Sequence, residues 1–109
     1  MDDLNNISPC HLVTHADGRF SLLLRADLAG HEDIFEALRR EPNGHCWSQV
    51  IQTVIAPEIQ STLLFDPEAD MVSIVGRDKD VLLQIAQQIR HLLDDEGALR
   101  AAIEKAEWD

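Results

Sequence analysis

The sequence predicts a two-layer α+β fold, in which one antiparallel sheet made of two hairpins is covered on one face by helices. Three observations predict it: an Asp-Gly turn between two β-forming runs, a second pair of β-forming runs later in the chain, and helical periodicity after each pair. The expected order of elements is ββααββαα. We expect residues 1–109 to form a single domain, because a chain of this length buries about two-thirds of the surface that it exposes when unfolded.

The first hairpin is expected at Asp17 and Gly18, which separate residues 10–15 from residues 19–25. Asp and Gly both tolerate the positive φ angles that such a turn requires, so this dipeptide between two β-forming runs is a strong hairpin signal. Side chains alternate between the two faces of a strand. The second run therefore places its large apolar residues on one face: Phe20, Leu22 and Leu24.

Two helices are expected after this hairpin. Residues 31–40 carry apolar residues at helical spacing, before the turn-forming residues 41–44. From Cys46 onward a clearer apolar stripe predicts a helix that packs on the sheet. This helix should end or kink at Pro57, because proline lacks an N–H and disfavours helical geometry at the residue before it. The stripe consists of Trp47, Val50, Ile51, Val54 and Ile55.

The second hairpin is expected to pair residues 62–65 with residues 71–76. Pro67, in the turn between them, is incompatible with a central strand. Asp78 then suits the N-cap of a helix over residues 79–93, and a final helix follows a short acidic break. The apolar pattern continues in that last helix at Leu99, Ala102, Ile103 and Ala106.

The chain is strongly acidic, with 20 Asp and Glu residues against 9 Lys and Arg residues and a formal net charge of −11. Such a potential repels nucleic acid and anionic membranes and attracts basic proteins. The charge therefore predicts binding to a cationic protein, with no direct contact to nucleic acid or membrane. The competing interpretation is that the charge serves solubility. The longest apolar runs are too short to span a bilayer.

The cysteines and the start of the sequence predict a reduced, cytoplasmic protein, and the surroundings of Cys46 predict that it is not an enzyme. Cys10 and Cys46 have no paired spacing, and residues 1–6 lack the pattern of a signal peptide. Cys46 precedes Trp47, as the catalytic thiol does in papain-like proteases, where a helix N-terminus lowers the thiol pKa. The downstream His91 is expected in mid-helix without an orienting partner. We therefore expect no catalytic residue.

No metal or cofactor site is expected either. His11 and His15 are four residues apart, which on a strand separates them by about 13 Å, too far to share an ion. An acidic alternation begins at Asp66, as at the start of an EF-hand calcium loop. However, Met71 and Arg77 stand where that loop needs a glycine and a bidentate glutamate.

The acids of the second hairpin and of the helix after it are candidate contacts for a basic partner. They lie close together in the sequence, and the strand between them can place them side by side. The competing interpretation is a solvated turn, since turns favour Asp and Pro for local reasons. Trp108 is a further candidate anchor, or else a cap on the last helix. The candidate acids are Asp66, Glu68, Asp70, Asp78 and Asp80.

Four motifs follow one another over residues 20–93. They are Ser21-Leu22-Leu23-Leu24 in an early strand, Gly44 shortly before Trp47 on an amphipathic helix, the run Phe65-Asp66-Pro67-Glu68-Ala69-Asp70-Met71, and a Leu/Ile-rich helical segment. This succession resembles the Imm51-type immunity proteins of bacterial polymorphic toxin and contact-dependent inhibition systems. Its most characteristic part is the Asp-x-Glu hairpin, in which Asp66 and Glu68 stand where the family pattern places them.

The resemblance implies an intracellular antidote that binds the C-terminal domain of one cognate toxin and blocks it. Toxins of this kind are often nucleases, which present a basic cleft. Two other function classes stay open on the residues alone. One is an acidic adaptor or regulatory module that binds another basic protein or self-associates through the hydrophobic sheet face. The other is a small hydrolase that uses Cys46, which the missing base disfavours.

Overall fold

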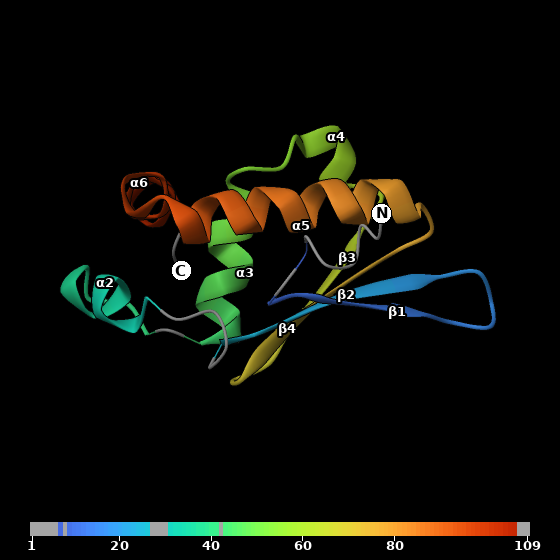
Figure 1. The fold of residues 1–109 in the computed structure, drawn as a ribbon, viewed down its shortest axis with the longest axis horizontal. Helices are drawn as coiled ribbons and strands as arrows, with labels where there is room; N and C mark the ends of the chain where they lie inside the picture. The colour runs from blue at the N-terminus through green and yellow to red at the C-terminus, as the bar shows by residue number, and fades with distance from the viewer. Residues whose placement is uncertain (1–6, 8, 27–30, 42, 107–109) are drawn as a thin grey trace.

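The computed structural model describes residues 7, 9–26, 31–41 and 43–106 (Figure 1). Within them the fold is α+β, as predicted, and its strands form one four-stranded antiparallel sheet. Trp108 lies outside the described residues. The elements in chain order are β1 (His11–Thr14), β2 (Phe20–Arg25), α2 (Glu32–Ala37), α3 (Gly44–Gln52), α4 (Pro57–Gln60), β3 (Leu64–Pro67), β4 (Met71–Gly76), α5 (Lys79–Asp94) and α6 (Glu96–Lys105).

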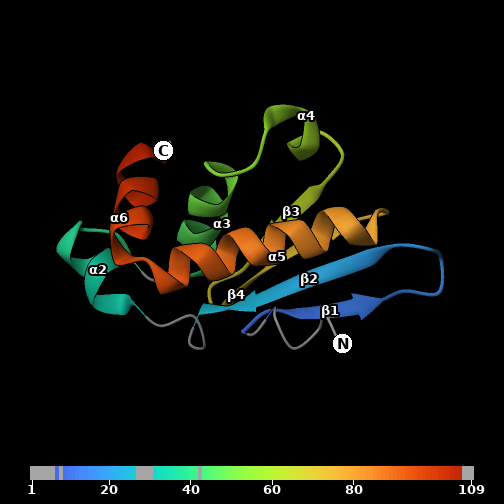
Figure 2. The same ribbon diagram turned by 45° about the horizontal axis from the view of Figure 1, so that its top comes forward.

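The sheet places the two hairpins side by side in the order β1-β2-β4-β3, so β2 and β4 are its central strands. Helices α3 and α5 pack on one face of it, and α6 contacts both of these helices beyond the end of the sheet (Figure 2). The predicted face of β2 is confirmed, because Leu22 and Leu24 are buried in the core and Phe20 is half-buried. No described helix covers the opposite face (Figures 1 and 2).

Trp47 is at the centre of the core and is fully buried. Its ring lies 4.9 Å from the ring of Phe35, with the two planes inclined by 50°, a geometry favoured between aromatic rings. Val50 and Ile51, on the same face of α3, are also fully buried. The apolar stripe predicted from the sequence is therefore the contact that fixes α3 between the sheet and the outer helices.

The first turn forms at the expected place but by a different mechanism. Gly18 has a φ angle of +88°, whereas Asp17 is not among the residues with positive φ. Asp17 instead accepts hydrogen bonds from the backbone N–H of Arg19 at 3.2 Å and from its Nε at 2.8 Å. The loop closes where the N–H of His15 donates to the carbonyl of Arg19 at 2.9 Å. Aspartate thus favours this turn as a hydrogen-bond acceptor.

The helix expected to end or kink at Pro57 ends before this residue, and a short helix that is not predicted from the sequence begins there. Helix α3 ends at Gln52, and Pro57 begins the additional short helix α4 at its first position, where a missing N–H has no cost. The side chain of Gln60 donates to the carbonyls of Gln52 and Ile55, at 2.9 and 2.8 Å, and so satisfies the end of α3. The order of elements over the described residues is therefore ββαααββαα.

The second hairpin and the helices after it agree closely with the prediction. Strand β4 spans the predicted residues, while β3 begins two positions later than expected and includes Pro67. Proline is tolerated there because β3 is an edge strand. Asp78 caps α5 as expected, since its Oδ1 accepts from the N–H of Asp80 at 3.0 Å. Asp95 alone separates α5 from α6 and caps the latter.

We expect the buried Cys10 to make the fold sensitive to alkali. Burial raises the pKa of its thiol from 9.0 to about 12, so the folded state holds the neutral form. The neutral thiol therefore contributes its full stabilisation of the folded state below pH 9. This contribution is lost as the pH rises toward 12, because the thiol of the unfolded chain ionises first. The free energy of unfolding should fall over that window by on the order of 3 kcal/mol.

Urea denaturation under reducing conditions, at a series of pH values, measures this loss. The chain contains no tyrosine, which removes one class of group that titrates in the same range. Cys10→Ala should be less stable at neutral pH but should lose less stability above pH 9. An equally steep alkaline loss in wild type and Cys10→Ala would assign the effect to other groups.

Candidate functional site

The acidic turn, residues 66–70, is held in place by its backbone. Within the turn, the N–H of Glu68 donates to the carbonyl of Met71 at 2.7 Å. The N–H of Ala26, which follows β2, donates to the carbonyl of Asp70 at 2.8 Å. The N–H of Gly44, the first residue of α3, donates to the carbonyl of Ala69 at 3.3 Å. The turn is therefore fastened to the end of β2 and to the start of α3.

Gly44 makes this attachment possible because it has no side chain. A Cβ atom at this position would overlap the carbonyl oxygens of Glu68 and Met71. The backbones of α3 and of the acidic turn thus approach more closely than any other residue would allow. Two motifs that are separate in the sequence, the glycine before Trp47 and the Asp-Pro-Glu-Ala-Asp run, form one structural unit.

The carboxylates of this unit are available to a partner. Asp66, Glu68 and Asp70 are all exposed. Asp66 lies opposite Ser73 in the sheet, on the face that the described helices leave open. Because the backbone beneath the three acids is fixed, they form a preorganised acidic edge, and binding a partner would require little ordering of the chain.

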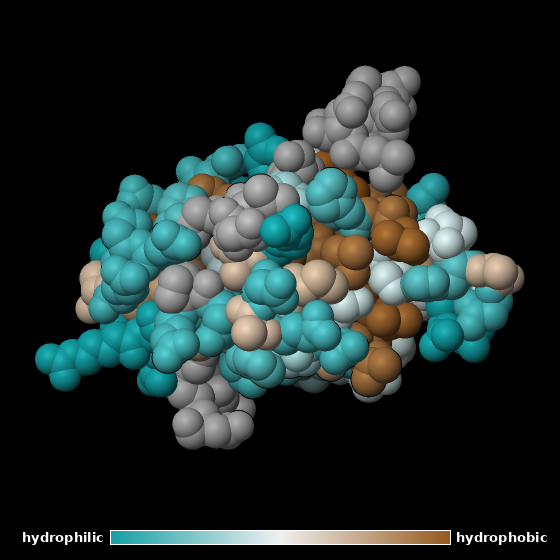
Figure 3. Space-filling model, turned by 90° about the horizontal axis from the view of Figure 1, so that it is seen from below, coloured by the Kyte–Doolittle hydropathy of each residue, from teal (hydrophilic) through white to brown (hydrophobic). Residues whose placement is uncertain are grey.

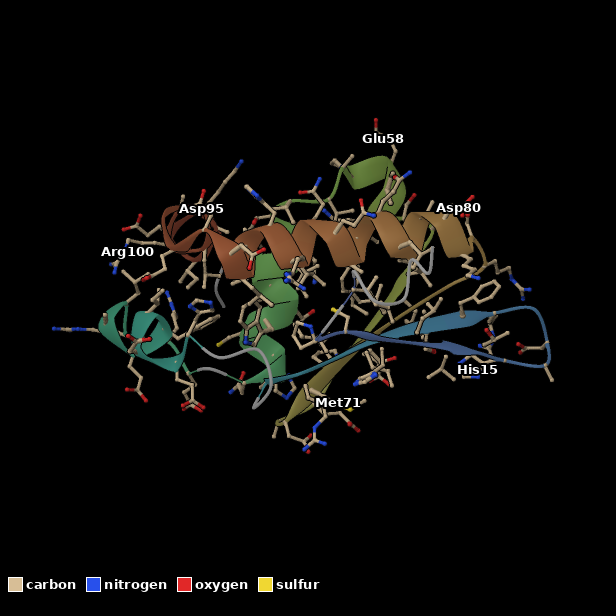
Figure 4. The ribbon with its side chains drawn as sticks, in the orientation of Figure 1. His15, Glu58, Met71, Asp80, Asp95 and Arg100 are labelled. Carbon is tan, nitrogen blue, oxygen red and sulfur yellow. The ribbon has the colours of Figure 1, made fainter. Side chains whose placement is uncertain are left out.

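Asp78 and Asp80 do not belong to this edge. They follow the other end of β4, and a strand of six residues spans roughly 20 Å. Figure 4 shows this separation between Met71, at the start of β4, and Asp80, in the first turn of α5. The structure therefore divides the five candidate acids into two groups, and the expectation that they lie side by side is wrong. One oxygen of Asp78 is also used to cap α5.

The surroundings of the second group reduce its negative potential. An open groove of about 700 Å³ lies between α4, the end of β4 and the start of α5. Three basic residues, Arg19, Arg77 and Lys79, line this groove together with the acids Asp78 and Glu58, and Arg19 is paired with Asp17. At the opposite end of β4, Arg25 pairs in register with Met71. The acidic edge at residues 66–70 is therefore the stronger candidate for contact with a cationic partner.

The environment of Cys46 does not favour nucleophilic chemistry. Its N–H donates to the Oδ1 of the N-cap residue Asn43 at 2.9 Å, so the thiol is at a helix N-terminus as in the proteases considered above. Nevertheless, burial raises the pKa of this thiol above its usual value, and the protonated form predominates at neutral pH. A nucleophile of this type would need the opposite shift.

The histidines are likewise not arranged as metal ligands. The Nε2 of His15 lies 2.7 Å from the Oγ of Ser21, a hydrogen bond across the first hairpin. The Nε2 of His31 lies 2.8 Å from the carbonyl of Leu93 and links α2 to the end of α5. Among the described residues, no three His, Cys, Asp or Glu side chains are grouped closely enough to hold a metal ion.

Comparison with protein families identifies the chain. The model of the immunity protein 51 family, Imm51, matches residues 10–108. The chain belongs to the Imm51 family. The match confirms the resemblance to this family and extends beyond residues 20–93, so it also includes β1 and α6. Searches of curated proteins and of solved structures returned no significant match.

Family membership identifies this Imm51 protein as an immunity protein, whose partner class is a toxin. It therefore favours the antidote over the adaptor and hydrolase interpretations. The acidic turn and Gly44, which the sequence singled out as family motifs, are the parts that the structure brings into contact. In the described part of the chain, the helices lack the combination of length and hydropathy needed to cross a membrane.

Proposed function

We propose that this Imm51 protein binds and neutralises a cognate toxin domain in the cytoplasm, and that this toxin is a nuclease with a cationic cleft. The observation that carries the proposal is family membership over residues 10–108. The net charge of −11 supports the nature of the toxin, because an enzyme that binds RNA or DNA must contact phosphates with basic residues. An acidic inhibitor is complementary to such a cleft.

The proposed mechanism is steric and electrostatic occlusion without chemistry. Long-range attraction brings the acidic edge at Asp66, Glu68 and Asp70 toward the basic toxin surface and raises the association rate. The fixed backbone of the turn then presents these carboxylates without a large entropic cost. A few buried contacts supply most of the affinity, as in other protein interfaces.

Growth rescue tests the proposed function. The toxin domain encoded beside this chain should stop growth when it is expressed alone, and co-expression of the immunity protein should restore it. Unrelated toxins of other families should remain lethal in the same cells. If the neighbouring toxin still killed cells that contained both proteins in soluble form, the proposed function would be wrong.

Neutralising the acidic edge should slow toxin capture. The triple variant Asp66→Asn, Glu68→Gln, Asp70→Asn removes three exposed charges. We expect its association rate to fall about tenfold at low ionic strength, and the difference to shrink near physiological salt, where charges are screened over about 8 Å. Stopped-flow association across a salt series measures both effects.

A matched control separates local from total charge. Glu36, Glu58 and Glu104 are exposed on α2, α4 and α6, and changing all three to glutamine alters the net charge by the same amount. This control should associate at nearly the wild-type rate. Equal rates for the two triple variants at every salt concentration would show that net charge, and not the acidic edge, governs capture.

Cys46→Ser should protect cells as well as the wild type does. Serine keeps a small polar side chain at the start of α3, and the raised thiol pKa gives no reason to expect covalent chemistry. Growth in the presence of the toxin is the measurement. A folded Cys46→Ser protein that bound the toxin yet failed to protect, together with selective labelling of Cys46 by a thiol reagent at neutral pH, would indicate an enzyme.

A further inference from the structure

A row of four residues crosses all four strands on the open face of the sheet; three of them are apolar and the fourth, Ser21 of β2, is a buried serine that hydrogen-bonds to His15, and we call this set the apolar row. Register places Val13 of β1 opposite Ser21 of β2, Ser21 opposite Val75 of β4, and Val75 opposite Leu64 of β3. Leu22, the neighbour of Ser21, faces the helices and is buried in the core, so this row points to the other side. Figure 3, which views the molecule from this side, shows hydrophobic residues gathered on one part of the face among hydrophilic ones.

The two ends of the row are its most exposed parts. Val13 retains 39% of its accessible surface and Leu64 retains 61%, and they are the exposed large hydrophobic residues among those the structure describes. Both lie on edge strands. Edge strands usually carry charged residues that prevent association, so exposed Val and Leu at both edges favour a surface that is covered in a complex.

Acidic residues adjoin the row on one side. Two residues along β4 from Val75, and on the same face, Ser73 lies opposite Asp66 of β3 and opposite Leu23 of β2. The acidic edge continues from Asp66 to Glu68 and Asp70. The open face therefore combines exposed apolar residues at both edges with acidic residues beside one of them, and protein interfaces likewise combine apolar contacts with polar ones.

We propose that this open sheet face is the toxin-binding surface, with Val13, Val75 and Leu64 as apolar anchors and Asp66 at the charged margin. The proposal rests on the proposed function and specifies the partner's chemistry. The complementary toxin surface has an apolar patch beside lysine and arginine residues.

Charge selects this occupant over a second copy of the chain. Two copies joined through the open face would bring together two molecules of net charge −11, and their mutual repulsion would oppose a dimer. A basic toxin gains attraction from the same charge. The acidic edge that attracts it is continuous with the apolar row through Asp66, so one partner surface can contact both.

The test is a double substitution of the exposed anchors, Val13→Lys and Leu64→Lys. Lysine is well tolerated on edge strands, and here it would remove the apolar contact and repel a basic partner. Titration of a catalytically inactive form of the neighbouring toxin domain should give a dissociation constant at least about 100-fold weaker than for wild type. A control with Gln87→Lys and Ala101→Lys, which adds the same charge on exposed positions of α5 and α6, should bind within about threefold of wild type.

The outcomes of these measurements distinguish a wrong assignment of the binding surface from a wrong proposed function. Wild type that fails to bind the toxin domain would overturn the proposed function itself. Wild type that binds while the Val13/Leu64 variant binds equally well would overturn only the assignment of this face. A wild-type dimer in light scattering that the lysine pair makes monomeric would assign the face to a second copy and would also contradict the proposal.

A second, milder pair of substitutions tests the same surface if the lysine variant does not fold. Val13→Thr and Leu64→Thr keep residues with high β-propensity on both edge strands. If thermal unfolding shows that the lysine pair is not folded, this pair decides. Its binding should be about tenfold weaker than that of wild type, and unchanged binding would contradict the proposal.

Discussion

Replacing Trp47 with alanine should destabilise the protein by about 3 to 5 kcal/mol, which is a large part of the stability of an ordinary domain. The side chain is fully buried, and its removal leaves a cavity between α3 and Phe35. Loss of protection in cells should follow from loss of the fold. Urea denaturation followed by circular dichroism measures the change.

Trp47→Phe is the matched control. The indole N–H of Trp47 has no hydrogen-bond partner among the described residues, so phenylalanine removes an unsatisfied donor while it keeps an aromatic ring against Phe35. Its cost should be well below that of the alanine variant. A denaturation midpoint unaffected by Trp47→Ala would show that Trp47 is not part of the core in solution.

Gly44→Ala should cost about 3 kcal/mol or more, although it adds only one methyl group. The new Cβ would overlap the carbonyl oxygens of Glu68 and Met71, and backbone atoms cannot rotate away as a flexible side chain can. Either α3 or the acidic turn must shift. We therefore expect lower stability and, in the molecules that remain folded, slower toxin capture.

Gly97→Ala provides the comparison. Gly97 is in the first turn of α6, where an added Cβ would lie 3.3 Å from a carboxylate oxygen of Asp95, at the end of an adjustable side chain. Alanine is also the better helix former, so the stability should change by less than about 1 kcal/mol. Equal effects of Gly44→Ala and Gly97→Ala would contradict the close approach of α3 to the turn.

The elements that could be predicted from the sequence have local signals. Strand β4 and helix α5 match their predicted residues because a β-forming run, an Asp78 cap and an apolar stripe each lie within one segment. Pro57 could not be assigned in the same way. Proline ends one helix and is also favoured at the first position of the next, and the hydrogen bonds of Gln60 decide between these outcomes.

The candidate site depends on contacts that the sequence does not contain locally. The acidic turn could be recognised from its residues, but its attachment to Gly44 arises from tertiary packing. Closeness in sequence suggested that Asp78 and Asp80 join the turn, whereas the extended β4 carries them to the opposite end of the sheet. The apolar row between Val13 and Leu64 depends on the register of four strands, which only their pairing defines.

The proposed function requires that this protein block a toxin by binding it. The most direct measurement is a titration of the purified toxin domain encoded beside it, in which calorimetry follows complex formation and a nuclease assay follows activity. We expect a complex with a dissociation constant of about 10 nM or tighter, and nuclease activity that falls to background at equivalence. Full toxin activity in the presence of excess folded immunity protein, with no heat of binding, would contradict it.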